Sequence, residues 1–463
     1  MEDAFRNRLV LAACILGSVI VFVDSTVVNV ALPSIRRDLG GGLTLQEWVV
    51  DAYLLTLGAL LLVGGSLGDL FGPRRLFLIG IVGFGVTSAI CAAAPDGTTL
   101  ILARGLQGVA GAILTPAGLA VITGTFEGEA RGAAVGTWTA WTGIAFLAGP
   151  LVGGWLVTHA SWRWVFLINL PLAAITLALV LVAVPKRPPR PDRARVDVLG
   201  GLLCGLGLTG PVFALIEAPN RGFGDPLILF ALVGGLAVLV LFVLWERRAP
   251  APMLPLRLFA LRNFSVTNVE TLAVYAGLST FSFFLVIFVQ QLAGYSALQA
   301  GLATIPITVV MFFLSPRVGR FSMRFGPRWF MGSGPLIGAA GLVWLSRLHP
   351  GFDYWADLLP PLIVFAFGLS LTVAPLTATV LADAGERDAG VASGVNNAVA
   401  RVAGLLGIAI LGALVAGSAN SLDVGGYRKA MEITAGLVAA GGVIGLVGIR
   451  NPSRAALRAA EQT

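Results

Sequence analysis

The sequence predicts an all-α membrane protein with 14 transmembrane helices, and three observations carry that prediction. The chain of 463 residues is 57% hydrophobic and 12% charged, whereas soluble domains carry about 25% charged residues. Apolar runs of roughly 20 residues, long enough to cross a bilayer core as a helix, recur along the whole length, and the mean hydropathy is +0.88. Basic residues gather in alternate connections between these runs.

The apolar runs define the expected helices in order. The first run is too long for a signal peptide, and the others follow it at short intervals. The expected helices are 9–32, 46–66, 76–95, 99–122, 132–157, 163–184, 197–217, 226–245, 264–290, 298–316, 329–347, 357–379, 391–417 and 430–449.

The distribution of positive charge predicts the orientation. With both termini in the cytoplasm, the inner connections hold 22 of the 31 lysines and arginines, and the outer connections hold 7. This bias follows the positive-inside rule. The net charge of +7 is therefore assigned to topology, and no nucleic-acid partner is expected. We expect a multi-pass protein of the cell inner membrane or plasma membrane.

Two basic, proline-containing inner linkers divide the chain. They are "PKRPPRPDRARVD" at 185–197 and "WERRAPAPMLPLRLFALRN" at 245–263. The expected organisation is an N-terminal six-helix bundle (1–184), two additional helices with their linkers (185–263) and a C-terminal six-helix bundle (264–463). "GSLGDLFGPRR" at 65–75 aligns with "GRFSMRFGPRW" at 319–329. Both segments follow the second helix of a half, as in transporters built from parallel repeats.

Enzyme and cofactor motifs are not supported. "GGSLG" at 64–68 matches G-x-S-x-G, but it closes a membrane helix and both histidines lie in outer loops. "GLGLTG" at 205–210 follows no strand, and no Gly-Lys-Ser/Thr phosphate loop exists. The three cysteines are far apart in apolar runs, without metal-ligand spacing. We expect no enzyme activity, no metal and no cofactor.

Asp24 is the first candidate functional residue. It lies inside an apolar run, where a carboxylate costs about 2.5–3.5 kcal/mol on insertion scales, so a functional role is the default hypothesis. The alternative is a structural aspartate, paired with an arginine or held neutral.

Asp51 and Arg104 stand at a similar expected depth, ~8 Å below the outer surface at ~1.5 Å per residue. One carboxylate can pair with Arg104, while burial favours the protonated form of the other. Three such groups facing one cavity would carry protons. Asn29, on the helix of Asp24, completes the candidates for proton coupling and substrate binding in this half.

The remaining candidates leave alternatives open. Glu270 either binds a cationic substrate or a second proton, or extends to the inner surface, and Arg401 lies midway along its helix. Trp138 and Trp141 either form an aromatic wall for a flat ligand or face lipid.

Two motifs indicate conformational elements. In "AFLAGPLVGGWL", Ala145, Gly149 and Gly153 form a small-residue stripe that admits close helix approach. Pro150 is expected to kink the same helix, because proline removes a backbone donor. The stripe is either simple tight packing or part of a moving interface.

The second motif is "GSLGDLFGPRR", where the Gly72–Pro73 pair makes a tight inner turn. In this turn Asp69 either caps a helix or pairs with an arginine. The conformational residues assigned to this motif are Gly65, Asp69, Gly72 and Arg74.

From residue 10 to 450, the chain resembles the fourteen-helix drug:proton antiporter branch of the major facilitator superfamily. The resemblance rests on "VDSTVVNVALPSI", "GSLGDLFGPRR", "LARGLQG", "AFLAGPLVGG" and "SWRWVFLINLP", with "QQLAGYSALQAGL" and "GVASGVNNAVARVAG" in the second half. It implies proton coupling and cation recognition by Asp24, Asp51 and Arg104, and an antiport hinge at Gly149 and Pro150. The sequence departs from the family pattern in three places: Leu70 replaces a basic residue, Met323 replaces the aspartate in the repeat, and Ala145 replaces a glycine.

The expected function is secondary active transport. Small amphipathic drugs or toxic compounds leave the cell by alternating access as protons enter, and the proton gradient is the only energy source. The expected partners are the substrate, protons and the lipid bilayer, with the chain acting as a monomer. Export of an endogenous metabolite or self-made antibiotic, and a facilitator or importer, are the alternatives.

Overall fold

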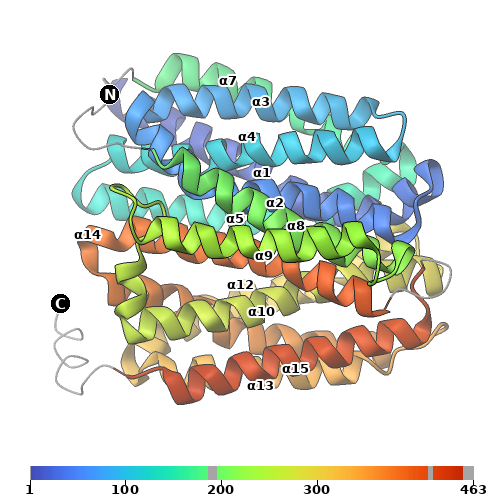
Figure 1. Ribbon diagram of the computed structural model, residues 1–463. Coiled ribbons are helices and arrows are strands. Elements are labelled where there is room, and N and C mark those ends of the chain that lie inside the picture. The colour runs from blue at the N-terminus through green and yellow to red at the C-terminus, as the bar shows by residue number, and fades with distance from the viewer. Residues whose placement is uncertain (1, 186–195, 416–420, 452–463) are drawn as a thin grey trace. The chain divides into compact units, whose positions relative to one another are not determined.

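The computed structural model describes residues 2–185, 196–415 and 421–451, and in these ranges all regular structure is helical. A short 3-10 helix, Leu256–Ala260, and two π-helical turns, Phe288–Leu292 and Tyr354–Leu358, connect α-helices (Figure 1). The α-helices are α1 (Glu2–Leu39), α2 (Gly42–Phe71), α3 (Pro73–Ala93), α4 (Gly97–Thr125), α5 (Gly128–His159), α6 (Trp164–Leu167), α7 (Asn169–Ala183), α8 (Val198–Arg221), α9 (Pro226–Glu246), α10 (Arg262–Ile287), α11 (Ala297–Ala303), α12 (Ile305–Phe325), α13 (Pro327–Leu345), α14 (Leu359–Val415) and α15 (Val424–Gly448).

Each of the expected apolar ranges lies mainly on helix, but the element boundaries differ from the prediction. Twelve helical segments of the described chain are long and apolar enough to cross a membrane, which is two fewer than predicted. α5 covers its expected range and α13 covers 329–345 of the expected 329–347, without being among these twelve. The chain is thus a multi-pass, all-helical membrane protein with about 12 spans.

The prediction of one loop is wrong. The interval 380–390, predicted to separate two helices, is helical, and both predicted helices belong to α14. Its 57 residues would measure ~86 Å if straight at ~1.5 Å per residue, far more than the ~30 Å bilayer core. Two candidate spans, Tyr354–Ala384 and Val391–Val415, lie along this one element. The charged residues of 380–390 indicate that the segment is polar, but a polar segment can also be helical.

The chain divides into two compact units, of which the first comprises Met1–Leu254 with Ser296–Leu302. Small residues bring its helices close together. A side chain at Gly64 of α2 would collide with the backbone of Ala112 on α4, and one at Gly108 of α4 would collide with the backbone of Tyr53 on α2. Such close approach maximises van der Waals packing, which drives helix association in lipid.

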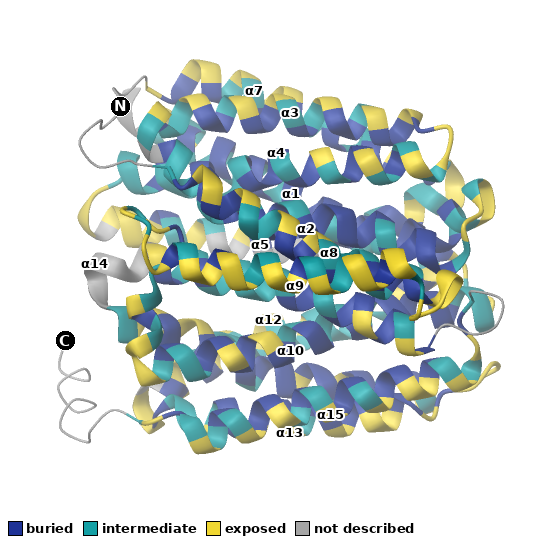
Figure 2. Cartoon of the chain, in the orientation of Figure 1, coloured by how far each residue is buried: buried dark blue, intermediate teal, exposed yellow. Residues whose placement is uncertain are grey.

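The helix pair α8–α9 belongs to the first unit and packs through α8 against α2. Trp48 Nε1 of α2 donates to Glu217 Oε1 of α8 at 2.9 Å, and Asn220 Nδ2 donates to Thr44 Oγ1 at 3.0 Å. α9 instead exposes much of its apolar surface, as Figure 2 shows, with Phe230 77% exposed. An apolar helix that is exposed over its length is suited to lipid contact.

The second unit, Pro255–Tyr295 with Ala303–Thr463, is assembled mainly from α10, α12, α13, α14 and α15. Glycines again admit close approach, since a side chain at Gly368 of α14 would collide with the backbone at Gly334 and Gly338 of α13. Phe288 and Tyr427 stack with ring centroids 4.0 Å apart and are both fully buried.

The predicted repeat forms the same local structure in both units. Gly72 joins α2 to α3 with φ 89° and ψ 134°, and Gly326 joins α12 to α13 with φ 84° and ψ 148°. Each is followed by a proline in the first turn of the next helix. A positive φ favours glycine, and the fixed φ of proline suits the first helical position. Two chain segments 254 residues apart therefore make equivalent turns.

Candidate functional site

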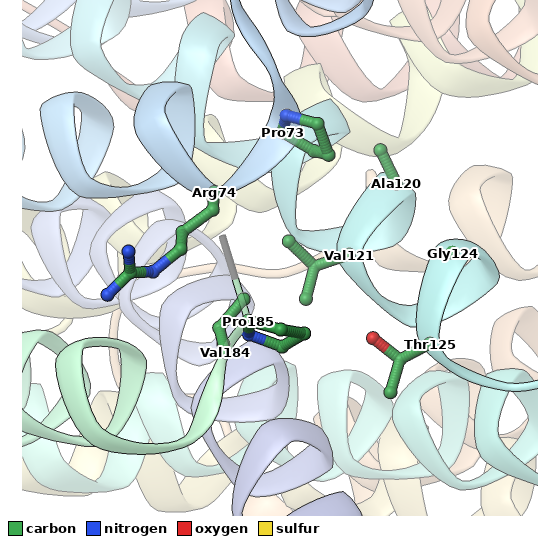
Figure 3. A pocket seen from close by; sticks show the side chains of 8 residues that line it. All are labelled: Pro73, Arg74, Ala120, Val121, Gly124, Thr125, Val184 and Pro185. Carbon is green, nitrogen blue, oxygen red and sulfur yellow. The ribbon is translucent and has the colours of Figure 1, made fainter. Parts of the chain in front are cut away.

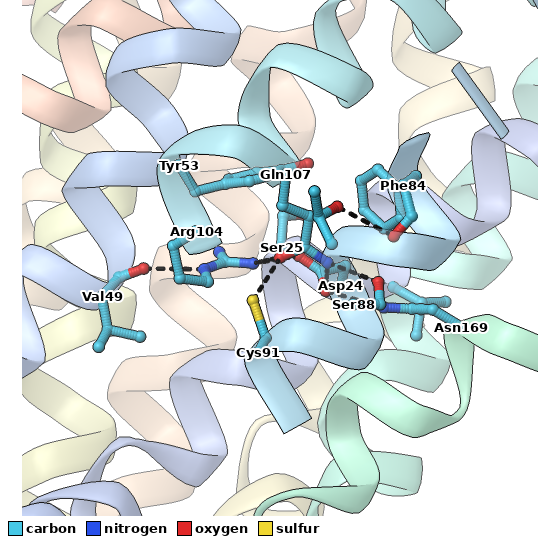
Figure 4. A network of polar contacts seen from close by, with 12 residues as sticks. Asp24, Ser25, Val49, Tyr53, Phe84, Ser88, Cys91, Arg104, Gln107 and Asn169 are labelled. Carbon is cyan, nitrogen blue, oxygen red and sulfur yellow. Dashed lines mark hydrogen bonds and ion pairs between the residues drawn. The ribbon is translucent and has the colours of Figure 1, made fainter. Parts of the chain in front are cut away.

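A buried polar network in the first unit surrounds Asp24 of α1 and Arg104 of α4 (Figure 4). Arg104 Nη1 donates to Asp24 Oδ2 at 2.6 Å, and the two side chains are 1% and 0% exposed. Arg104 also donates to Gln107 Oε1 at 2.6 Å and, through Nε, to the Val49 carbonyl of α2 at 2.9 Å. The ion pair therefore links three helices at one point.

Amide groups complete the coordination of Asp24. Gln107 Nε2 and Asn169 Nδ2 each donate to Asp24 Oδ1 at 3.0 Å. Both amides also donate to Ser88 Oγ of α3, at 2.8 Å and 3.2 Å. Both carboxylate oxygens are thus satisfied, which a buried ion pair needs if attraction is to offset desolvation.

Aromatic side chains enclose the arginine. The Arg104 guanidinium lies 4.2 Å from the ring centroid of Tyr53 and 5.8 Å from that of Phe166. These faces attract the cation and separate it from bulk water. Cys91 Sγ, 3.6 Å from Gln107 Oε1, is a weak donor at the edge of the network. The geometry suits a site where loss of charge on Asp24 would release Arg104 from its partner.

Ser88 and Asn169 were not among the residues selected from the sequence. Both are fully buried polar residues in apolar helices. In the sequence, each is a single amide or hydroxyl residue within an apolar run, and such residues are too frequent to indicate a site. Only the packing of α3 and α7 against α1 and α4 shows that Asn169 bonds the carboxylate and that Ser88 bonds the two amides beside it.

Asp51 does not join this network, so the three groups expected to meet do not all do so. Asp51 is fully buried, and neither carboxylate oxygen has a hydrogen-bond partner. Tyr53, whose ring lies over the Arg104 guanidinium, is two residues away, about 200° around the helix at 3.6 residues per turn. Asp51 therefore projects from the opposite side of α2, where Glu47 lies one turn away.

The other expected residues of this half have separate surroundings. Trp138 Nε1 donates to Ser18 Oγ of α1 at 2.8 Å, whereas Trp141 is 50% exposed. An aromatic wall and lipid contact both stay predictions for this pair. Asn29 is half-buried on α1, with a side-chain oxygen that has no hydrogen-bond partner.

In the second unit, Glu270 is fully buried, and neither carboxylate oxygen has a hydrogen-bond partner. The carboxylate lies inside the second unit, and its role stays a prediction. A side chain at Gly445 of α15 would collide with Glu270 Oε2, so this glycine makes room for the carboxylate. Half-buried Arg401 of α14 interacts electrostatically with Tyr275 of α10.

A polar contact also joins α10 to α14 in this unit. Asn396 Nδ2 donates to Thr271 Oγ1 at 2.8 Å and to Asn268 Oδ1 at 3.2 Å. Neither asparagine was selected from the sequence. Among the residues that the structure describes, no group of three or more His, Cys, Asp or Glu side chains is placed to hold a metal ion.

The conformational motif at 65–75 occupies the junction of α2 and α3. Asp69 lies in the last turns of α2, and its side chain is outside the described residues. Gly65 faces Pro116 of α4, since a methyl group added at Gly65 would lie 3.8 Å from the Pro116 Cβ, in ordinary van der Waals contact.

Arg74 Nη2 donates to the Leu181 carbonyl of α7 at 3.2 Å. Arg74 and Pro73 also line a pocket shared with the ends of α4 and α7, and the guanidinium extends away from the other labelled side chains (Figure 3). Arg74 thus links the α2–α3 turn to the end of α7 through a hydrogen bond.

The small-residue stripe of α5 faces α1. A side chain at Gly149 would collide with Thr26, and one at Gly153 would collide with Val27. Pro150 lies inside α5, and its carbonyl approaches Gly301 of the segment 296–302. The close approach of α5 to α1 therefore requires glycine at 149 and 153. The close approach of the segment 296–302 to α5 likewise requires glycine at 301.

Comparisons with known proteins agree with this architecture. The family model described as the Major Facilitator Superfamily matches residues 14–408. The puromycin resistance protein pur8 of Streptomyces alboniger is 39% identical over 418 residues, covering 88% of this chain and 82% of that protein. The cephamycin export protein CmcT of Amycolatopsis lactamdurans is 37% identical over 425 residues, covering 91% and 87%. The xylose transporter XylE from E. coli has a similar fold, with a TM-score of 0.66 at 14% identity and 98% of each chain covered.

Proposed function

The chain belongs to the Major Facilitator Superfamily and is a transporter rather than an enzyme, and from that premise we propose that it exports small amphipathic compounds in exchange for protons. The observation that carries the proposal is the fully buried carboxylate of Asp24, paired with Arg104 inside the membrane-spanning part of the first unit. Intramembrane ionisable groups of this kind mark substrate and proton pathways.

The substrate class follows from the named relatives. Proteins 39% and 37% identical to this chain are named for puromycin resistance and for cephamycin export. We therefore place toxic compounds, including antibiotics made by the producing cell itself, ahead of nutrients. Each proton entering through a potential of 100 mV supplies ~2.3 kcal/mol.

In the proposed mechanism, the buried carboxylates Asp24, Asp51 and Glu270 have different roles. Protonation of Asp24 would weaken its bond to Arg104, and so change the contacts that hold α1, α2 and α4 together. Asp51 has no partner on either oxygen, and a buried unpaired carboxylate is held at lower cost when neutral. Asp51 is therefore proposed as a proton-carrying group that acts from the other side of α2. Glu270, also buried without a partner, is proposed as the corresponding group of the second unit.

The finer architecture is part of the proposal. It comprises 14 spans in the fourteen-helix drug:proton antiporter branch, both termini in the cytoplasm, and a division into 1–184, 185–263 and 264–463. The helices α5 and α13, which cover all or most of their expected ranges, support two spans beyond the twelve candidates. The charge bias between alternate connections supports the orientation.

Transport into inverted membrane vesicles tests the function. Vesicles containing the protein should accumulate puromycin or ethidium when a proton gradient is imposed, and an uncoupler should abolish the accumulation. Vesicles without the protein are the control. Uptake of either compound that persists with the uncoupler would favour a facilitator, and uptake of neither would remove the drug-export proposal.

A further inference from the structure

A second group of acidic side chains lies on α2, away from Arg104. Glu47 and Asp51 are one turn apart, with side-chain origins about 5–6 Å from each other. They are 2% and 0% exposed, and three of their four carboxylate oxygens, Glu47 Oε1 and both of Asp51, are buried without a hydrogen-bond partner. Buried polar atoms are usually bonded, so this arrangement calls for an explanation.

The additional helix α8 brings a third carboxylate to this place. Glu217 accepts a hydrogen bond from Trp48 Nε1, the residue next to Glu47, and interacts electrostatically with Glu47. Arg221 Nε lies 4.0 Å from Glu217 Oε2, and the Glu217 side chain is 21% exposed. Exposure therefore falls stepwise from Glu217 through Glu47 to Asp51.

We propose that Glu217, Glu47 and Asp51 form a proton-transfer route from the surface of α8 to the core of the first unit. The proposal rests on the proposed proton coupling and gives it a path. It also gives the helix pair α8–α9 a function in transport, because α8 supplies the carboxylate at the entry of the route. In the proposed orientation, the ends of α2 and α8 that carry these residues face the outside, where protons enter.

Each transfer moves one proton between two carboxyl groups. The O–H bond of the donor breaks as an O–H bond forms on the acceptor, so the donor becomes a carboxylate and the acceptor becomes neutral. Glu217 takes its proton from solvent and passes it to Glu47, which passes it to Asp51. One-turn spacing can be crossed by side-chain rotation or through one water molecule.

A purely structural role does not explain the three unbonded oxygens. Arg104 is committed to Asp24 and to the Val49 carbonyl, on the other side of α2. At the outer end of α1, Arg37 donates to Ser34 and Asp38 accepts from Arg163. Arg221, which is 48% exposed, lies beside Glu217. Arg36 also lies at that end of α1.

The test uses proteoliposomes loaded with puromycin or ethidium, whichever compound the wild type transports more strongly. Two assays then separate proton transfer from substrate exchange. Uptake driven by a pH gradient requires net proton movement, whereas counterflow of labelled against unlabelled compound does not. In Glu47→Gln, driven uptake should fall by about tenfold to 100-fold, the scale of losing a general acid or base, while counterflow stays near the wild-type rate. Glu47→Asp, which keeps a carboxylate, should restore part of the driven rate.

Glu217→Gln is an independent variant, because glutamine still offers Trp48 an acceptor. It should slow driven uptake and leave counterflow intact. Asn220→Ala is the matched control, since it removes an α2–α8 hydrogen bond without removing a carboxylate, and it should keep the driven rate. Wild-type driven uptake in both glutamine variants, or equal loss of counterflow and driven uptake in them, would overturn the route. Absence of driven uptake in the wild type would instead overturn the proposed function.

Discussion

Asp24 and Asp51 are both fully buried aspartates, yet their surroundings are opposite. Asp24 is bonded through both oxygens, to Arg104 and to two amides. Asp51 has no partner on either oxygen. Burial of a charge is tolerated when the charge is paired and hydrogen-bonded, and otherwise the group is held neutral. The two residues should therefore respond differently to the same substitution.

Asp24→Asn should reduce stability and abolish proton-driven export. Arg104 would lose its ionised partner, and breaking a buried pair on one side costs about 3–5 kcal/mol. The double variant Asp24→Asn/Arg104→Gln should recover part of this loss, because no uncompensated charge remains. Thermal unfolding in detergent measures the stability, and vesicle uptake measures the export. Full drug resistance in cells that express Asp24→Asn would contradict the proposed coupling role.

Asp51→Asn should leave stability almost unchanged and impair transport of cations. The asparagine has nearly the shape of the neutral acid and breaks no hydrogen bond, so the unfolding free energy should change by less than about 1 kcal/mol. Because Asp51 is proposed as the end of the proton route, proton-driven uptake should fall for ethidium and for neutral drugs, and the loss should be larger for the cation ethidium. Unchanged cation transport would show that Asp51 has only a structural role.

At the scale of elements, the contact of α5 with α1 depends on two glycines. Side chains at Gly149 and Gly153 would collide with Thr26 and Val27 of α1. Thr26 Oγ1 is itself held by the Val23 carbonyl at 3.0 Å, so it cannot easily move aside. The same helix carries Pro150, next to the segment 296–302. Close packing and the capacity to move are compatible here, since a smooth glycine surface allows one helix to slide on another.

Gly149→Ala should destabilise the first unit and slow transport. The added methyl group overpacks a tight contact, which costs about 1–3 kcal/mol. Gly136→Ala on the same helix is the control, because a methyl group there would meet nothing within 4 Å. Unfolding temperature and uptake rate should fall for the first variant and stay at wild-type values for the second. Equal behaviour of the two variants would show that the α1–α5 contact adapts freely.

At the scale of the whole molecule, the helix pair α8–α9 belongs to the first compact unit. α8 contacts α2 through Trp48–Glu217 and Asn220–Thr44, whereas α9 exposes much of its apolar surface. The connection between the pair and the second unit passes through the 3-10 helix Leu256–Ala260. The pair is placed to influence α2, and through it the carboxylates that α2 carries.

The proposed topology predicts that the two ends of α9 lie on opposite sides of the membrane. Gly224→Cys, before α9, should react with a membrane-impermeant maleimide added to intact cells. Arg248→Cys, after α9, should react only in inverted vesicles. The wild type is the control, since Cys14 and Cys91 are buried and Cys204 is half-buried. Labelling of both positions from the same side would contradict a transmembrane α9 and the count of 14 spans.

The sequence was most informative where one residue or one run carried the signal. Apolar length predicted where helices form, and the Gly72 and Gly326 turns were visible as a repeat. Asp24 and Arg104 stood out because charges are costly among apolar residues. Helix rotation was not visible, so Asp51 was grouped with Arg104 although it projects from the other side of α2. The connection within α14 was also missed, because a polar segment can be either loop or helix.

The amino-acid order by itself determined that this chain is a bundle of membrane-spanning helices with a few buried charges, because the cost of polar groups in lipid acts on each residue locally. Tertiary structure alone decided which charges meet. The partners of Asp24 come from positions 80, 83 and 145 residues away, and only packing of α1, α4 and α7 brings them together. The same packing leaves Asp51 outside the network of Arg104, since the direction in which a side chain leaves its helix decides its partners only once the neighbouring helices are in place.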